Sequence, residues 1–297
     1  MAPSSRDLAA HGDRDALRHA VLGFGRRGLR PLPWRATRDP WAVLVSEVML
    51  QQTQVARVVD PYHRFMERFP TPSACARAGL GAVLVAWAGL GYNRRAQSLH
   101  AAAEVIVARH GGKVPWELDD LVALPGVGPY TARAVLAFAS ERPVAVVDTN
   151  IRRLLARALV GRPLSQGAAQ GLANELVPPR AAWLWNQSLM EIGALVCRAR
   201  RPACSRCPVR SQCAWRASGS KAPDPGAPRT VQSRFDGSDR QGRGRLVQAL
   251  RSGPVRPSGL AVACGWPEDP GRAERVADGL VTEGVARRGR GGTLALP

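Results

Sequence analysis

The chain has 297 residues, 45% of them hydrophobic, which is enough for two domains, or for one large domain with an appendage, around a real core. Its 42 Lys and Arg residues against 23 Asp and Glu give a formal net charge of +19, so the expected partner is a polyanion, nucleic acid before a membrane surface. The longest apolar stretches, such as AVLVAWAGLGY, are far too short to cross a bilayer, which excludes a transmembrane helix.

From about residue 15 to residue 213, the sequence predicts an all-α domain. Apolar residues recur at intervals of three and four, Gly and Pro interrupt the pattern, and period-two alternation is nearly absent. Residues 1–14 are polar, contain no apolar signal segment and are expected to be disordered. The expected helices are 15–26, 41–60, 80–88, 94–110, 116–124, 129–140, 151–159 and 183–196.

The helix expected over residues 41–60 contains a carboxyl group in an apolar setting. Glu47 lies in WAVLVSEVMLQQTQV, with Val43, Leu44 and Leu50 as its helical neighbours. We expect this side chain to be partly desolvated, and desolvation favours the protonated form of a carboxyl group, which a general acid needs. The alternative is a salt bridge at the edge of the core.

The segment LDDLVALPGVGPYTARAVLAFA predicts two helices joined by a tight loop at residues 124–128. Two glycines in this loop allow the backbone to turn sharply and leave N–H groups at a helix N-terminus. A DNA phosphate can dock on such groups without recognition of a base. The alternative is a simple turn between two helices.

Asp148 follows a short apolar run and opens the next helix in RPVAVVDTNIRRLLARAL. Its position makes it a good N-cap residue. The N-terminus of a helix also stabilises negative charge, which suits a carboxylate that must stabilise developing positive charge. The two roles are compatible.

Four cysteines lie close together near residue 200. They are Cys197, Cys204, Cys207 and Cys213, in the spacing C-x6-C-x2-C-x5-C. Four thiolates can close the coordination of an iron–sulfur cluster or a structural zinc completely, so the centre is expected to be structural. Zinc stays open, although the first gap fits a zinc ribbon poorly, and disulfides would require a secreted protein. Cys75 and Cys264 are interpreted as ordinary small apolar residues.

Residues 216–241 are rich in Pro, Gly, Ser and charge, which predicts a linker. Three short helical segments and two short strands around a basic, Gly-rich turn follow it. This order predicts a small winged-helix-like module over residues 242–297. The alternative is a helical appendage that does not contact DNA.

Taken together, the hairpin LPGVGPYTA, Asp148 and the cysteine loop resemble the helix–hairpin–helix DNA glycosylase superfamily with its [4Fe–4S] loop. Within it, PLPWR, SEVMLQQTQV, GLGYNRRAQSL and VDTNIRRLLAR resemble the MutY-like adenine glycosylases, which act on A mispaired with 8-oxoguanine. The match covers about residues 15–215, and its motifs are long and mutually consistent. The resemblance implies a two-lobed all-α fold, made of a six-helix barrel and an iron–sulfur cluster domain.

The resemblance also implies that the DNA is bent and that adenine is flipped into a pocket. Glu47 would protonate adenine at N7, and Asp148 would stabilise the oxocarbenium-like sugar with help from Tyr130 and Asn150. Core packing is the main alternative for Trp34 and Glu191. The resemblance further implies substrate binding by Trp34, Arg35, Gln51, Gln52, Tyr92 and Glu191, of which Gln52 and Tyr92 would enter the DNA stack. The DNA backbone would be bound by Gly126, Val127 and Gly128. The four cysteines would hold a [4Fe–4S] cluster.

One substitution separates subfamilies of this resemblance. Related bifunctional enzymes, which also cut the strand, place a Lys nucleophile where this chain has Tyr130. Neither of the two lysines, Lys113 and Lys221, lies in the hairpin, so no Schiff base forms by that route. The sequence therefore predicts a monofunctional enzyme.

The C-terminus departs from the family pattern. Bacterial relatives usually carry a Nudix-like, β-rich domain that checks the 8-oxoguanine, and the chain after Cys213 is too short and too helical for one. Recognition of the opposite base would fall to Gln52 and Tyr92, or else to arginines of the winged-helix-like module. Those arginines are Arg287, Arg288 and Arg290.

Two rival functions remain open at this point. A mismatch thymine glycosylase would share Tyr130 and Glu47, although the QQTQ sequence from Gln51 favours adenine. A DNA-binding regulator with a cluster would leave Glu47 and Asp148 without a role. The leading prediction is a bacterial, nucleoid-associated cytoplasmic monomer that binds double-stranded DNA with A:8-oxoguanine or A:G mispairs, does not bind membranes, and has an unidentified partner, if any, for its C-terminal module.

Overall fold

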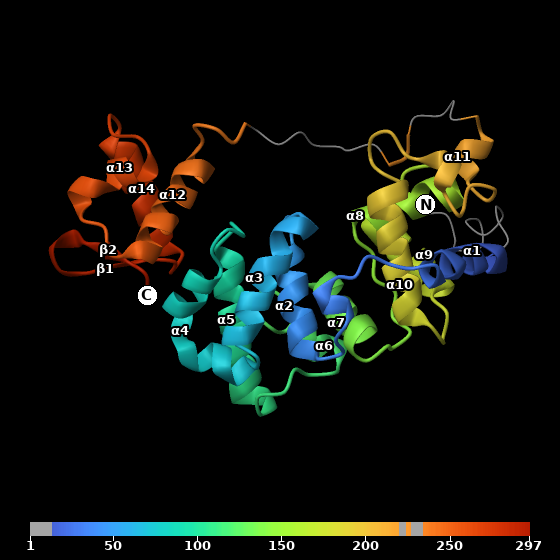
Figure 1. The fold of residues 1–297 in the computed structure, drawn as a ribbon, viewed down its shortest axis with the longest axis horizontal. Coiled ribbons are helices and arrows are strands. Elements are labelled where there is room, and N and C mark those ends of the chain that lie inside the picture. Colours follow the sequence, from blue (N-terminus) through green and yellow to red (C-terminus); the bar gives the residue numbers. More distant parts are fainter. Residues whose placement is uncertain (1–13, 220–223, 227–233) are drawn as a thin grey trace. The chain divides into compact units, whose positions relative to one another are not determined.

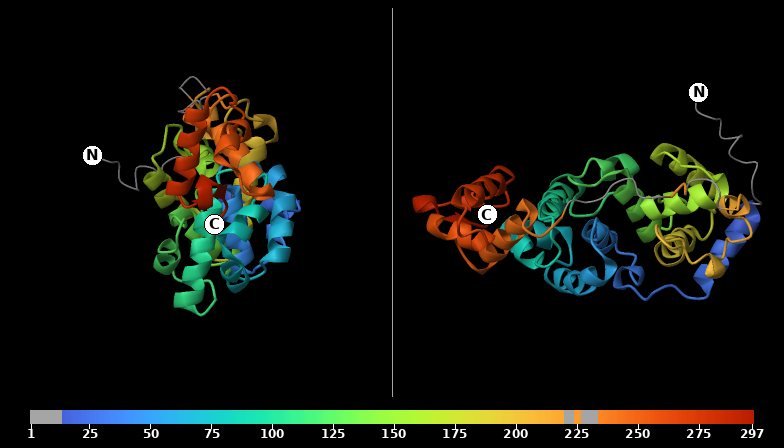
Figure 2. Two further views of the ribbon diagram at one scale, coloured as in Figure 1. Left: turned by 90° about the vertical axis from the view of Figure 1, so that its left-hand side faces the viewer. Right: turned by 90° about the horizontal axis from the view of Figure 1, so that it is seen from above.

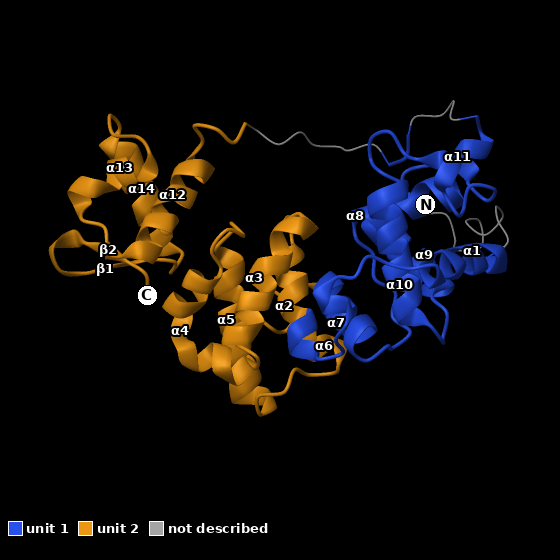
Figure 3. Ribbon diagram, in the orientation of Figure 1, with its two compact units in different colours: residues 1–43, 129–231 blue, residues 44–128, 232–297 orange. Residues whose placement is uncertain are grey.

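The computed structural model describes residues 14–219, 224–226 and 234–297, and these residues are mostly helical (Figure 1). The predicted all-α fold is therefore confirmed. The expected disorder of the N-terminus falls outside the described residues, as do residues 220–223 and 227–233 of the expected linker. The chain divides into two compact units, each made of two segments (Figure 3). Unit 1 comprises residues 1–43 and 129–231, and unit 2 comprises residues 44–128 and 232–297.

Unit 1 is a group of short helices around one hydrophobic core. Helix α1 packs on α10, and α8 packs on α9. The core includes Leu17 and Val21 of α1, Ile151 of α8 and Trp185 of α10, all of them buried. Its helices are α1 (Arg14–Arg26), the 3-10 turn η1 (Pro33–Arg35), α7 (Pro129–Ala139), α8 (Thr149–Leu155), the π-helix η2 (Ala156–Val160), α9 (Gln166–Leu176), α10 (Ala182–Glu191), the π-helix η3 (Ile192–Val196), the 3-10 turn η4 (Cys204–Arg206) and α11 (Ala214–Ala217).

The first segment of unit 2 begins within α2 (Pro40–Leu50), whose first residues belong to unit 1. Helices α4 and α5 form its most extensive helix pair. Aromatic side chains pack next to this pair. The rings of Phe65 of α3 and Trp87 at the end of α4 meet edge to face, with centroids 5.9 Å apart. The helices of this segment are α3 (Val55–Arg68), α4 (Pro72–Ala86), α5 (Arg94–His110) and α6 (Leu118–Val122).

The second segment of unit 2 is the C-terminal module, drawn in orange and red in Figures 1 and 2. Strands β1 and β2 pair antiparallel, with Arg287 opposite Ala295, and Val255 forms a further bridge to Leu294. The predicted order of three helices and a two-stranded wing is confirmed. Its elements are α12 (Asp239–Ser252), the 3-10 turn η5 (Pro257–Gly259), α13 (Leu260–Cys264), α14 (Pro270–Thr282), β1 (Arg287–Arg288), the 3-10 turn η6 (Arg290–Gly292) and β2 (Leu294–Ala295).

Several predicted helix boundaries were wrong. The helix expected over 41–60 is two helices, α2 and α3, because the chain turns between them at Gln52 with φ 55°. The segment expected over 80–88 is the end of the longer α4. Helix α9 was missed, since its sequence QGAAQGLANEL is rich in Gly and Ala and has a weak apolar stripe. No helix within the described ranges is long and apolar enough to span a bilayer.

Candidate active site and cysteine loop

Asp148 is the N-cap of α8, as predicted. Its Oδ1 accepts a hydrogen bond of 2.6 Å from the backbone N–H of Ile151, and its Oδ2 accepts one of 2.9 Å from Asn150 Nδ2. Both donors approach the carboxylate from the first turn of the helix, whose positive end also favours negative charge. The half-buried carboxylate is thus held in one orientation.

A buried arginine connects this cap to the beginning of the cysteine loop. Arg153 Nη2 donates to Asn150 Oδ1 at 2.8 Å and to the carbonyl of Gly193 at 2.7 Å, while Nε donates to the carbonyl of Cys197 at 2.8 Å. Burial lowers the pKa of Arg153. A Cβ atom at Gly193 would come within 2.9 Å of Asn150 Cβ, so only Gly permits this approach of η3 to α8. No pattern in the sequence indicates this linkage.

Glu47 lies in α2, in the part of the helix that belongs to unit 2. The residue is only 6% exposed, and Ser46 and Val48 beside it are also buried. The expected desolvation of this carboxyl group is therefore confirmed. Asp148, Tyr130 and Asn150 belong to unit 1. Tyr130 lies in the first turn of α7 and is half-buried.

The predicted hairpin loop between α6 and α7 is present. Val127 donates its N–H to the carbonyl of Leu124 at 3.1 Å and is buried, whereas Gly126 and Gly128 are exposed. Gly126 has a φ of 74°, and a Cβ atom there would lie 2.5 Å from Ser98 Cβ of α5. Glycine is thus required at position 126 by the backbone conformation and by packing.

The PLPWR segment is anchored by the end of α10. Arg30 donates to Glu191 through Nε at 2.6 Å and Nη2 at 2.9 Å. Arg35 donates to Glu191 Oε2 at 3.0 Å and to Gln187 Oε1 at 2.7 Å. Burial alone would raise the pKa of Glu191, but hydrogen bonds from Arg30 and Arg35 lower it to about 2. Trp34, between the two arginines in sequence, is buried.

Gln51, Gln52 and Tyr92 come together at one end of the helices of unit 2. Gln52 and Tyr92 both adopt positive φ, 55° and 46°, which is uncommon for residues other than Gly. Arg95, which was not predicted as a site residue, joins their two turns. Its guanidinium donates to the carbonyl of Gln51 at 2.7 Å and to that of Leu90 at 3.0 Å, and burial lowers its pKa to about 10.

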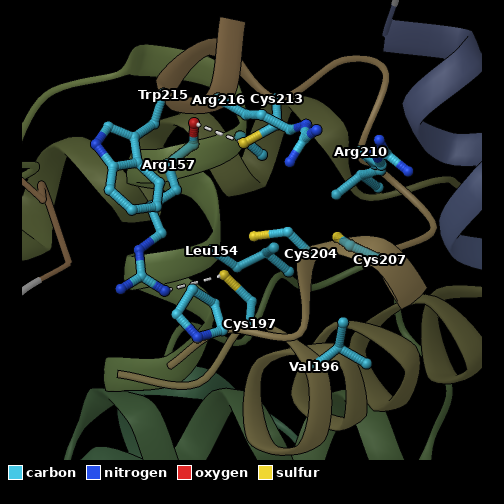
Figure 4. Close-up of a pocket in the computed structure, with 13 residues that line it drawn as sticks. Leu154, Arg157, Val196, Cys197, Cys204, Cys207, Arg210, Cys213, Trp215 and Arg216 are labelled. Atoms are coloured by element: carbon cyan, nitrogen blue, oxygen red, sulfur yellow. Dashed lines mark hydrogen bonds between the residues drawn. The ribbon is translucent and has the colours of Figure 1, made fainter. Parts of the chain in front are cut away.

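The four clustered cysteines line one pocket in unit 1 (Figure 4). All six cysteines of the chain are free, so the disulfide alternative is wrong. Arg157 lies against the pocket: Nη1 donates to Cys197 Sγ at 3.4 Å, and Nε donates to Asp224 Oδ1 at 2.8 Å. Burial raises the pKa of the Cys207 thiol to about 11, and the backbone hydrogen bond from Val209 opposes this shift only in part.

Comparison with known proteins decides the family. The family described as HhH-GPD superfamily base excision DNA repair protein matches residues 45–179. The adenine DNA glycosylase of Mycobacterium tuberculosis strain H37Rv is 45% identical, over 93% of this chain and 92% of its own length. This chain is a member of the adenine DNA glycosylase family. The human adenine DNA glycosylase is 42% identical over 70% of this chain and 40% of its own length.

Solved structures confirm the fold of this glycosylase. A thermostable thymine-DNA glycosylase has a TM-score of 0.66 and 30% identity, over 69% of this chain and 97% of its own. Endonuclease III in a trapped covalent intermediate with DNA has a TM-score of 0.61 over 71% of this chain, and its 22% identity shows the fold alone. The alignment with the mycobacterial relative covers 93% of the chain and therefore extends into residues 242–297.

The residues of the cysteine pocket fit an iron–sulfur cluster. Among the described ranges, no three His, Cys, Asp or Glu side chains lie close enough together to hold a single metal ion. A structural zinc needs four ligands about 2.3 Å from one point, whereas the four cysteines of a [4Fe–4S] cluster each bind a different iron and need not converge. In this glycosylase, Figure 4 shows the four side chains around a common space, which suits the larger group.

Proposed function

We propose that this protein is a monofunctional DNA glycosylase, which hydrolyses the N-glycosidic bond of adenine mispaired with 8-oxoguanine or guanine. The single observation that carries the proposal is the fixed carboxylate of Asp148, which accepts hydrogen bonds from Ile151 N–H and the Asn150 side chain. Membership in the adenine DNA glycosylase family supplies the substrate class. The protein would act in base excision repair as a monomer in the bacterial cytoplasm.

The chemistry requires an acid and a stabilising anion. Glu47, which is buried, donates a proton to N7 of adenine, so that the C1′–N9 bond breaks and its electron pair leaves with the base. The sugar then carries positive charge, and the ionised Asp148 stabilises that charge until water adds at C1′. The products are free adenine and an abasic site.

The remaining site residues position the DNA. Trp34, Arg35 and Glu191 contact the flipped adenine or hold the wall of its pocket, and the ion pairs of Glu191 favour the second role for that residue. Gln52 and Tyr92 enter the base stack, and Gln51 supports them. Tyr130 lies close to the sugar. The backbone N–H groups of the hairpin bind a phosphate, at Gly126, Val127 and Gly128.

The cysteine pocket would hold a [4Fe–4S] cluster through Cys197, Cys204, Cys207 and Cys213. The cluster supplies structural cross-links, since binding of metal to four thiolates orders the loop that contains them. Arg153 and Arg157 hold the backbone of this loop at the carbonyls of Cys197 and Arg198. Tyr130 replaces the lysine of strand-cutting relatives, so no lyase activity by a hairpin amine is expected.

Single-turnover excision on three duplexes tests this proposal. The duplexes contain A opposite 8-oxoguanine, A opposite G, and T opposite G, each measured with and without alkali. Alkali-dependent cleavage at A supports a monofunctional adenine glycosylase. Cleavage without alkali contradicts the monofunctional assignment. The duplex with T opposite G is included because the chain is similar to a thymine-DNA glycosylase. Cleavage of this duplex alone would indicate a mismatch thymine glycosylase instead.

A further inference from the structure

The C-terminal module is docked on the helices next to Tyr92, within unit 2. Arg251 of α12 donates to the carbonyl of Leu84 at 2.9 Å and to Asn93 Oδ1 at 3.0 Å. Gln97 of α5 donates to the carbonyl of Glu283 at 2.7 Å. Burial lowers the pKa of Arg251, as expected for a guanidinium enclosed by the contact. These hydrogen bonds fix the position of the module beside the turn that contains Tyr92.

A cavity of about 380 Å³ lies between the module and the turns that carry Gln52 and Tyr92. This volume falls within the range of ordinary ligand pockets. The walls come from two chain segments that are far apart in sequence. They are Gln51, Gln52, Tyr92, Asn93, Arg94 and Arg95 from the first segment, and Arg240, Arg243 and Glu283 from the module.

Four arginines and one carboxylate give this cavity a positive charge. Glu283 offsets part of it, because Oε2 lies 2.6 Å from Arg243 and 3.9 Å from Arg94. Arg240, at the first turn of α12, lies over the ring of Phe235 and also lines the cavity, so four arginines surround it with a single carboxylate. An anionic group is therefore the expected occupant.

We propose that the cavity receives a backbone phosphate of DNA beside the mispair, and that Arg240 and Arg243 bind it. The inference rests on the proposed function, in which Gln52 and Tyr92 enter the base stack. DNA that they enter must pass its backbone next to their turns, where the cavity lies. The guanidinium group suits phosphate, and such a contact positions the duplex without reading its sequence.

Two arginines of the wing, by contrast, are bound within the module. Arg288 binds Asp278 at 2.6 Å and also binds Glu274, both from α14. Arg287 donates to the carbonyl of Leu296 at 3.2 Å. These partners neutralise Arg288 and restrain Arg287. The proposed phosphate contact is therefore placed at the start of α12 and not at Arg288, whose charge two carboxylates offset.

The test compares Arg240→Gln with Arg275→Gln, a matched change at an exposed arginine of α14 in the same module. Binding is measured by fluorescence anisotropy over a series of KCl concentrations. The probe is a duplex with a stable abasic analogue opposite 8-oxoguanine. Loss of one phosphate contact should reduce the slope of log Kd against log salt by about 1. Arg275→Gln should leave the slope of the wild type, and both variants should keep the wild-type Tm.

A slope for Arg240→Gln equal to that of Arg275→Gln would overturn the inference. Base excision by the wild-type protein is measured on the same preparation with A opposite 8-oxoguanine. Wild-type excision with equal slopes refutes the cavity contact alone. Absence of adenine excision refutes the proposed function, and the inference with it, whatever the slopes are.

Discussion

Asn150 donates a hydrogen bond of 2.9 Å to the carboxylate of Asp148. The oxygen of the same amide accepts from Arg153, whose other donors hold the carbonyls of Gly193 and Cys197. Asn150 therefore bridges a carboxylate and a guanidinium that do not contact each other directly. The orientation of Asp148 depends in this way on the position of the cysteine loop, which gives the proposed cluster an indirect influence on the proposed chemistry.

Asn150→Ala should slow adenine excision. The change removes one of two donors to the Asp148 carboxylate, and a hydrogen bond to a charged group contributes about 1.5–3 kcal/mol, or roughly a 10- to 150-fold change in rate. Single-turnover excision measures the effect. Asn174→Ala on the exposed face of α9 is the matched control, and a rate for Asn150→Ala within twofold of that control would contradict the role.

Asp148→Asn separates the charge of this residue from its capping role. Asn caps helices about as well as Asp, so the Tm should change little. The amide carries no negative charge, so the excision rate should fall by more than about 100-fold, the scale seen when one electrostatic group of an active site is removed. Excision at a wild-type rate would show that stabilisation of the sugar does not depend on Asp148.

Local signals in the sequence were sufficient for some features and not for others. Asp148 was placed correctly at a helix N-terminus, because capping depends only on the neighbouring residues. The Glu191 ion pairs were missed, since Arg30 lies 161 positions away and no local pattern specifies so distant a partner. The turn at Gln52 was also missed, because the apolar pattern of α2 resumes in α3 after it.

Tyr92 shows the same difference between local sequence signals and contacts that depend on packing. Its motif was recognised from the sequence, whereas the cavity that it shares with Arg240 depends on how the C-terminal module packs in unit 2. The order of helices and strands in that module could be predicted from composition and periodicity. The way the module packs against α5 could not be predicted, because it depends on single hydrogen bonds such as that from Gln97 to the carbonyl of Glu283.

Glu191→Gln should destabilise the protein in a pH-dependent way. The folded-state pKa of about 2 lies below the ordinary value of 4.5, so the ionised carboxylate stabilises the fold fully above about pH 4.5 and loses this contribution as the pH falls towards 2. The variant should lose about 2 kcal/mol of the free energy of unfolding at pH 7. Urea unfolding between pH 7 and pH 3 measures this difference, which should begin to shrink only below about pH 4.5. A difference that instead grows as the pH falls would contradict the assignment.

The hairpin offers a matched pair of glycines. Gly126→Ala forces a Cβ atom onto Ser98 and a side chain into a left-handed backbone conformation, so it should cost about 1–3 kcal/mol of the free energy of unfolding. Gly128→Ala meets no atom within 4 Å and has no positive φ, so its cost should stay below about 1 kcal/mol. Chemical denaturation measures the free energy of unfolding of both variants. Equal losses of this free energy would show that Gly126 is no more strictly required than Gly128.

Cys204→Ser should reduce the iron content and DNA affinity of the purified protein together. The proposed cluster orders the loop between Cys197 and Cys213, so loss of one of four thiolates should weaken metal binding and leave the loop less ordered. Cys264→Ala in α13 is the control, because this cysteine lies outside the pocket and should leave iron and DNA binding unchanged. Iron is measured by colorimetric assay and affinity by anisotropy with a mispaired duplex. Zinc in place of iron in the wild-type protein would reject the cluster, and unchanged iron in Cys204→Ser would remove that residue from the ligand set.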